Sequence, residues 1–159
     1  MEIQDNICSI YHGSNVVVKV PVIRAYGFYK DFGFGFYCTR MENQAIRWAL
    51  TKRGEHFVSR YNYVPDESVK ALLFDEMTDE WLDFVASCRM GVPHDFDIVE
   101  GPMADDQIWD YVEDYIAGAI SREAFWELAK FKVPTHQIVF CTEKALSTLS
   151  FVEYKSYDK

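Results

Sequence analysis

The sequence lacks the features that mark membrane, exported and zinc-binding proteins. No apolar run approaches the roughly 20 residues of a membrane-spanning helix, and residues 1–5 lack the basic and apolar regions of a signal peptide. None of the cysteines forms a Cys-x-x-Cys pair, which argues against a zinc site: Cys8, Cys38, Cys88 and Cys141. We therefore expect a cytoplasmic protein with reduced thiols, no metal and no membrane attachment.

An excess or a long run of positive charge is also absent, although a local basic patch on the folded surface stays open. The chain has 25 acidic and 16 basic residues, a formal net charge of −9, and no run of Lys and Arg interleaved with aromatic residues. Such a charge balance repels polyanions in general. Nucleic acid is therefore not an expected partner.

Apolar and aromatic residues, by contrast, are abundant. They make up 49% and 16% of the chain, which excludes a disordered protein, and 159 residues are enough to bury a core in one domain spanning residues 1–159. Alternating and helical apolar spacings predict strands mainly near both ends and helices mainly between them, which favours the α+β class. Expected strands cover residues 7–11, 35–39, 57–64, 69–74, 96–99, 137–141 and 151–154. Expected helices cover residues 41–53, 78–88, 105–117, 121–131 and 143–149, with a turn at Gly101-Pro102.

A first polar motif, Tyr11-His12-Gly13-Ser14-Asn15, ends the first expected strand. A histidine there can hydrogen-bond a ribose hydroxyl, and a glycine lets a ligand approach the backbone because it has no Cβ. The plain structural alternative is a strand that ends in a turn.

Two further motifs follow along the chain. In Gly33-x-Gly35-Phe36-Tyr37 the tyrosine ring can stack on a flat heteroaromatic group, although an aromatic-packed turn explains the same residues. The dinucleotide-binding pattern Gly-x-Gly-x-x-Gly is absent. Gln137 opens an apolar strand, where it shares a face with Val139 and Cys141; His136 lies on the opposite face, beside this site. The alternative for Gln137 is a solvated residue at a strand end.

The order of histidine, tyrosine and a late polar strand residue resembles the His-Tyr-Glu class of ADP-ribosyltransferases, the diphtheria-toxin and poly(ADP-ribose) polymerase superfamily. More closely, the chain is similar to a family of small bacterial proteins, domain-of-unknown-function family 3990. The motifs that carry this resemblance are Tyr11-His12-Gly13-Ser14, Asp31-Phe32-Gly33-x-Gly35-Phe36-Tyr37, Gln44-Ala45, Trp48-Ala49, Asp97-Ile98-Val99-x-Gly101-Pro102-x-Ala104-Asp105-Asp106 and Gln137-Ile138-Val139-Phe140.

The resemblance implies a split antiparallel sheet of the ADP-ribosyltransferase type with peripheral helices, and NAD as co-substrate. It implies that the Gly13 backbone holds the nicotinamide carboxamide, Tyr37 stacks on the ring and His12 binds the adenosine-side ribose. Gln137 then takes the place of the usual glutamate at the nicotinamide ribose. Further contacts to NAD are expected from Ser14, Asn15 and Gly35.

Two acidic residues, Asp105 and Asp106, are candidates for the acceptor side of the site. One of them would handle the proton of the acceptor, although adjacent acids also simply favour the start of a helix.

The resemblance thus implies a mono-ADP-ribosyltransferase. Glutamine hydrogen-bonds but cannot act as a general base, so we expect transfer of one ADP-ribose to a macromolecular acceptor, with a protein as the first candidate, rather than chain extension. Such a protein could be the toxin of a bacterial toxin–antitoxin pair, with a small antitoxin as partner. Two alternatives stay open: a catalytically inactive NAD-binding or protein-interaction module, and an NAD glycohydrolase.

Overall fold

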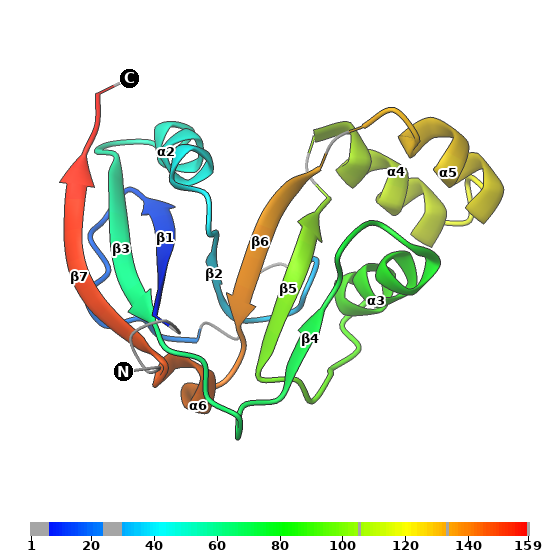
Figure 1. Ribbon diagram of the computed structural model, residues 1–159. Helices are drawn as coiled ribbons and strands as arrows, with labels where there is room; N and C mark the ends of the chain where they lie inside the picture. The colour runs from blue at the N-terminus through cyan, green and yellow to red at the C-terminus, as the bar shows by residue number, and fades with distance from the viewer. Residues whose placement is uncertain (1–6, 24–29, 105, 133, 159) are drawn as a thin grey trace.

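The computed structural model describes residues 7–23, 30–104, 106–132 and 134–158, which form two sheets and five helices (Figure 1). The first sheet has the order β1-β3-β7, with β1 (Cys8–Ser14), β3 (Phe57–Tyr63) and β7 (Leu149–Ser156). The second has the order β2-β6-β5-β4, with β2 (Phe36–Cys38), β6 (Thr135–Phe140), β5 (Ile98–Met103) and β4 (Ala71–Leu73). The helices are α2 (Glu42–Leu50), α3 (Asp79–Arg89), α4 (Asp106–Ile116), α5 (Arg122–Ala129) and α6 (Glu143–Leu146).

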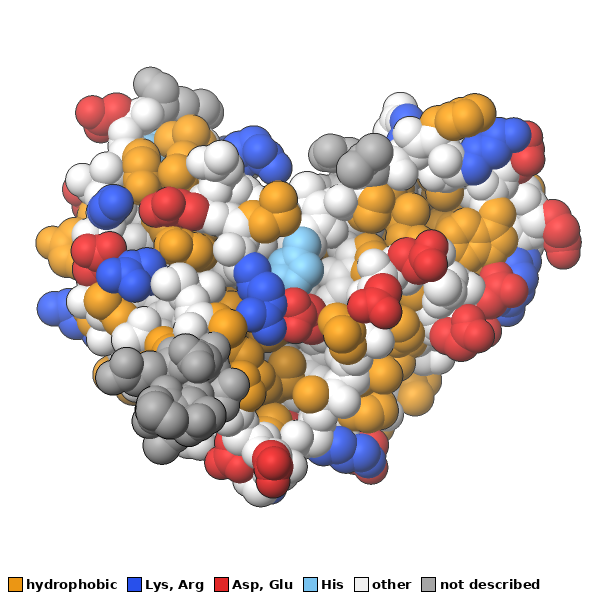
Figure 2. All heavy atoms as spheres, viewed as in Figure 1, with side chains coloured by type: hydrophobic (Ala, Val, Ile, Leu, Met, Phe, Trp, Pro, Cys, Tyr) orange, Lys and Arg blue, Asp and Glu red, His pale blue; other side chains and the backbone are white. Residues whose placement is uncertain are grey.

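Within the described residues, one backbone bridge joins the two sheets, and beyond it their strands diverge. The backbone N–H of Tyr11 on β1 donates to the carbonyl of Thr39 at 2.8 Å, and the N–H of Thr39 donates back at 2.9 Å. Beyond this bridge a side chain, rather than a strand, hydrogen-bonds the edge of β6. The buried amide of Gln44 on α2 bonds both the N–H and the carbonyl of His136. Figure 2 shows a notch between the two halves of the molecule in this region.

The two faces of β6 pack against different parts of the molecule: one against the first sheet and the other against the helices. Ile138 and Phe140 pack with Ile10 and Tyr61 of the first sheet in one core cluster. Val139 belongs to a second cluster with apolar residues of α3, α4 and α5. Figure 1 shows these helices on the side of the second sheet that faces away from the first sheet. The alternation expected for this strand therefore fixes which of its side chains face the helices.

Several expectations are confirmed and two are wrong. The α+β class is confirmed, and Thr78 and Ser121 cap α3 and α5 by accepting hydrogen bonds from the N–H groups of Trp81 and Ala124. The second sheet is not wholly antiparallel, because β4 pairs parallel with β5. Gly101-Pro102 is not a turn: both residues lie inside β5 and pair with Gln137 and His136 of β6.

Pro102 is tolerated within β5 because the backbone N–H that proline lacks would not be used to pair with a neighbouring strand at this position. His136 directs its own N–H and carbonyl away from β5, toward Gln44, so the Pro102–His136 pair exchanges no backbone hydrogen bonds. The other edge of β5 is paired with β4 only as far as Glu100. The proline therefore removes no ladder hydrogen bond, as is usual for proline in strands.

The described helices are short, with at most 11 residues, and none of them has the length and apolarity of a membrane span. None of the four cysteines, all of which lie among the described residues, forms a disulfide. Cys88 lies in α3, and Cys141 follows the last residue of β6 rather than lying within it.

Glu100 on β5 lies at the centre of a charged cluster on the face opposite Gln137. Its carboxylate accepts hydrogen bonds from Arg40 Nε at 2.6 Å, Arg40 Nη2 at 3.0 Å and His136 Nε2 at 2.7 Å. Burial opposes ionisation, but the hydrogen bonds and charges of His136 and Arg40 outweigh it and lower the pKa of Glu100 to about 2.

We expect Glu100→Gln to lower the free energy of unfolding at pH 7. Because the folded-state pKa of Glu100 lies below its ordinary value of 4.5, the stabilisation is complete above that value and is lost as pH falls toward 2. Urea unfolding of both proteins between pH 7 and pH 3 measures this, and the difference between them should shrink as pH falls below 4.5. A constant difference across this range would show that the charge of Glu100 contributes nothing.

Candidate functional site

Two adjoining cavities, of about 440 and 550 Å³, open where the sheets separate. They share five lining residues: His12, Gly13, Lys30, Tyr37 and Lys52. The first cavity adds the predicted residues Ser14, Asn15 and Gly35 to an otherwise mainly apolar wall. The second adds Gln137, together with Asp31, Trp48, Thr51, Met103, Ala104 and Trp109.

The structure thus brings together the residues predicted from three distant motifs. Gln137 reaches the same cavity as His12, Gly13 and Tyr37, although 100 residues separate it from Tyr37 (137 − 37). The acceptor-side candidate Asp105 lies outside the described residues, as does the side chain of Asp106.

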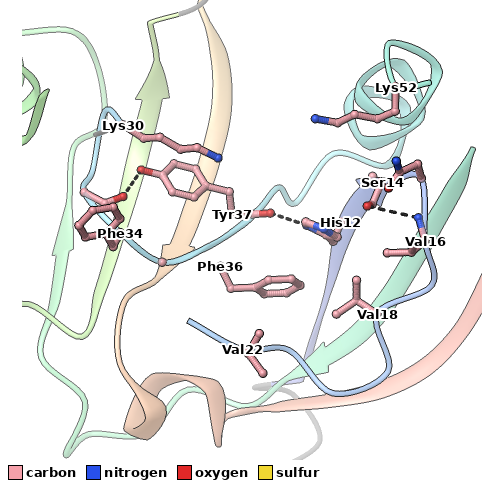
Figure 3. Close-up of a pocket in the computed structure, with 14 residues that line it drawn as sticks. His12, Ser14, Val16, Val18, Val22, Lys30, Phe34, Phe36, Tyr37 and Lys52 are labelled. Atoms are coloured by element: carbon pink, nitrogen blue, oxygen red, sulfur yellow. Dashed lines mark hydrogen bonds between the residues drawn. The ribbon is translucent and has the colours of Figure 1, made fainter. Parts of the chain in front are cut away.

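His12 is held in a defined orientation and tautomer. Its Nδ1 lies 2.7 Å from the backbone carbonyl of Tyr37, and its ring stacks on Phe36 with centroids 4.4 Å apart (Figure 3). Because a carbonyl only accepts, the neutral ring carries its proton on Nδ1, and Nε2 is its acceptor atom. That pattern is suited to accepting a hydrogen bond from a sugar hydroxyl.

Gly13 is required by packing as well as by its position on the cavity wall. A Cβ at this residue would lie 2.1 Å from the carbonyl oxygen of Ala45 and 2.9 Å from the N of Ala49, both on α2. Backbone groups of alternate strand residues point to the same edge, and Tyr11 uses its groups on Thr39. Gly13, which lines both cavities, therefore directs its N–H and C=O toward the side on which β2 leaves β1.

Tyr37 presents a ring whose hydroxyl is already occupied. The hydroxyl donates to the Gly33 carbonyl at 2.6 Å and accepts from the Phe32 N–H at 3.1 Å, and burial raises its pKa well above 10. Lys30 Nζ lies 5.0 Å from the ring centroid. The tyrosine is thus fixed as a neutral aromatic surface in the cavity wall, where it can contact a flat ligand.

Gln137 is the least satisfied polar residue of the site. It is 1% exposed, and its Nε2 has no hydrogen-bond partner among the described residues. It lies near enough to Asp31 for its amide to favour the ionised form of that carboxyl, although no hydrogen bond between the two forms. A buried donor without a partner costs about 1–3 kcal/mol, so this amide is suited to a ligand that supplies an acceptor.

The sequence did not indicate a role for the buried ion pair beside Gln137. Asp31 Oδ1 accepts hydrogen bonds from Arg89 Nε at 2.9 Å and Nη2 at 2.6 Å, and Oδ2 accepts from the Ala104 N–H at 2.7 Å. Asp31 belongs to the glycine-containing motif before Tyr37, whereas Arg89 ends an ordinary amphipathic helix and carries no local signal. Lys30 and Lys52 were likewise not singled out.

Comparison with known proteins identifies a family for the chain. Neither the curated proteins nor the solved structures yield a match to the chain. The family described as protein of unknown function (DUF3990) matches residues 8–151. This range includes every residue that lines the two cavities, and it includes both sheets except for the last residues of β7. The chain therefore belongs to the DUF3990 family.

Proposed function

We propose that this protein is an NAD-dependent mono-ADP-ribosyltransferase. One observation carries the proposal: His12, Gly13, Tyr37 and the unpartnered amide of Gln137 converge on one cavity. These groups are a sugar-hydroxyl acceptor, a backbone amide edge, an aromatic face and a buried donor. A nicotinamide riboside has a matching feature for each of them.

The two sheets support an ADP-ribosyltransferase-type core in this proposal. They are joined by a backbone bridge between Tyr11 and Thr39 and then diverge, so that the site lies in the split between them. β1 carries His12, β2 carries Tyr37 and β6 carries Gln137, which is the arrangement that the resemblance to the His-Tyr-Glu class implies.

The adjoining cavities suit the two halves of a dinucleotide. Each falls within the range of about 300–1,000 Å³ that is usual for small-molecule sites. In our proposal the nicotinamide half occupies the cavity with Gln137, and the adenosine half occupies the cavity lined by Val16, Val18 and Phe36. Lys30 and Lys52 line both cavities, and Figure 3 shows their side chains extending toward each other above His12 and Tyr37. A diphosphate would pass between them.

The reaction breaks the bond between the anomeric carbon of ribose and the nicotinamide nitrogen. Both bonding electrons leave with nicotinamide, so positive charge develops on the ribose, as in glycoside hydrolysis. Gln137 would hold a ribose hydroxyl in the orientation that favours this step, and Tyr37 and Gly13 would hold the leaving group. Since Gln137 takes up no proton, a good nucleophile on the acceptor is needed, which favours single transfers.

The experiment that tests the function is nicotinamide release. Purified protein incubated with NAD and bacterial lysate should release nicotinamide, measured by chromatography, and transfer ADP-ribose to a macromolecule in the lysate. Release with free ADP-ribose as the only other product would indicate a glycohydrolase. NAD binding without release would indicate the inactive module, which the missing carboxylate at position 137 also favours. A protein that neither binds nor cleaves NAD would contradict the proposal.

Neutralising the two cavity lysines should weaken NAD binding. We expect Lys30→Gln/Lys52→Gln to lower affinity about two- to thirtyfold in calorimetry, because each lost charge near a solvated phosphate contributes roughly 0.2–1 kcal/mol. The wild-type affinity should also fall more steeply with salt than that of the variant. The control is Lys155→Gln on exposed β7, outside both cavities. Equal affinities for wild type and the double variant would show that the diphosphate does not bind between Lys30 and Lys52.

A further inference from the structure

The Asp31–Arg89 ion pair belongs to a larger cluster behind the Gln137 cavity. Arg89 Nη1 also donates to Glu113 Oε2 at 3.0 Å and to the Trp109 carbonyl at 3.2 Å. Its guanidinium carbon lies 3.6 Å from the centroid of the Trp109 ring. The Asp31 and Arg89 side chains are 4% and 2% exposed, whereas the Glu113 side chain is 50% exposed. One buried guanidinium is therefore shared by two carboxylates.

This arrangement turns the negative end of the buried ion pair toward the cavity. Glu113 is half exposed and screened by water, so the buried charges are the Asp31 carboxylate and the Arg89 guanidinium, of which the carboxylate lies on the cavity side. Asp31 lines the cavity together with Gln137 and Trp109, while neither Arg89 nor Glu113 is among the described residues that line it. A ligand in the cavity thus meets the carboxylate first and the guanidinium only behind it.

We propose that Asp31 supplies the fixed negative charge that stabilises the developing positive charge on the ribose, in place of a carboxylate at position 137. This inference rests on the proposed function. Asp31 is the only carboxylate among the described residues of both cavities, and it lies next to the neutral Gln137. Preorganised charge in a site that excludes water is often the largest single contribution to catalysis.

The carboxylate acts without changing its protonation state. As the bond to nicotinamide breaks, the electron pair leaves with the ring, positive charge appears on the ribose, and Asp31 neither gives nor takes a proton. Arg89 and the Ala104 N–H occupy defined positions on its two oxygens, so no reorganisation is needed during the step. Burial raises the pKa of Asp31, while the charge and hydrogen bonds of Arg89 and the Ala104 amide oppose that rise.

A purely structural role makes a different prediction, which permits a decisive test. Asp31 also ties the segment before β2 to Ala104 and α3, and this role can be served by apolar side chains. Replacing a buried ion pair by apolar residues of similar volume is often neutral or stabilising. The double variant Asp31→Leu/Arg89→Met should therefore fold, with Glu113 left solvated, but it lacks the charge at the cavity.

We expect this variant to bind NAD within about threefold of wild type, because most ligand contacts remain, but to release nicotinamide roughly 100-fold more slowly or worse. A matched control removes a surface ion pair outside both cavities, Arg60→Met/Glu153→Leu, and should leave the rate unchanged. Adding Gln137→Glu to the double variant should restore most of the rate, because it returns a carboxylate to the site. If the double variant were slow only because its structure was disrupted, adding Gln137→Glu would not restore the rate.

The outcomes separate this proposal from the function on which it rests. A folded double variant that cleaves NAD at the wild-type rate overturns the role of Asp31 and leaves the transferase standing. Wild-type protein that releases no nicotinamide overturns both. If thermal unfolding shows that the double variant does not fold, the isosteric Asp31→Asn provides the test: a fall in kcat with unchanged KM supports the charge role, and an unchanged kcat overturns it.

Discussion

Replacing Gly13 by alanine is expected to lower the free energy of unfolding by about 3 kcal/mol or more. The new methyl group would overlap the Ala45 carbonyl oxygen at 2.1 Å, and that oxygen belongs to the backbone of α2, which cannot rotate away like a side chain. Either β1 or the whole helix must shift, and overpacking of this kind typically costs about 1–3 kcal/mol, more where backbone is opposed.

Gly54→Ala is the matched control for this prediction. Gly54 has a positive φ of 85°, but apart from its two chain neighbours no atom of the described residues lies within 4 Å of the position of its Cβ. Its substitution should cost only about 1 kcal/mol of backbone strain. Urea unfolding of the three proteins measures the difference. If Gly13→Ala is no less stable than Gly54→Ala, the close contact between β1 and α2 does not exist as described.

The second large effect is expected at Gln137. We expect Gln137→Ala to slow nicotinamide release about ten- to hundredfold, because loss of a buried hydrogen bond to the ribose costs roughly 1–3 kcal/mol if the contact tightens in the transition state. The control is Gln107→Ala, which removes an exposed amide on α4 outside both cavities. Equal rates for Gln137→Ala and wild type would reduce Gln137 to an ordinary buried strand residue.

Gln137→Glu tests the same position in the opposite direction. A carboxylate there should stabilise charge on the ribose and orient water, so hydrolysis of NAD should rise. Because Asp31 lies nearby and is itself an acid, the pKa of the introduced glutamate should be raised. The gain should therefore be small in acid and should grow as pH increases. A rate that is independent of pH and equal to wild type would contradict this.

The local parts of the fold were predictable from the sequence because they depend on neighbouring residues. The alternation in β6 placed Gln137 and Val139 on one face, and Thr78 and Ser121 marked the starts of two helices. The parallel pairing of β4 with β5 was not predictable, since register between distant segments leaves no local pattern. Gly101-Pro102 was predicted to be a turn from its local pattern, whereas its place in β5 rests on pairing with Gln137 and His136, which are distant in the chain.

The candidate site likewise contains residues that the sequence predicted and residues that it did not. His12, Tyr37 and Gln137 were selected through a resemblance, and they line one cavity. The buried partner of Asp31 lies 58 residues away on α3, where a basic residue in the last helical turn is unremarkable. Gly13 was interpreted as a point of ligand approach, whereas its contact with α2 gives an equally strong reason for glycine. Contacts between distant segments decide these roles.

The most direct test of the proposed activity is transfer from NAD labelled in the adenylate phosphate. After incubation with the purified protein and lysate, label should appear on a macromolecule, and mass spectrometry should find single ADP-ribose units on the modified acceptor. The label should decrease in parallel for Gln137→Ala and for Asp31→Leu/Arg89→Met, while Gln107→Ala matches wild type. Unlabelled macromolecules together with intact NAD after prolonged incubation would contradict the assignment.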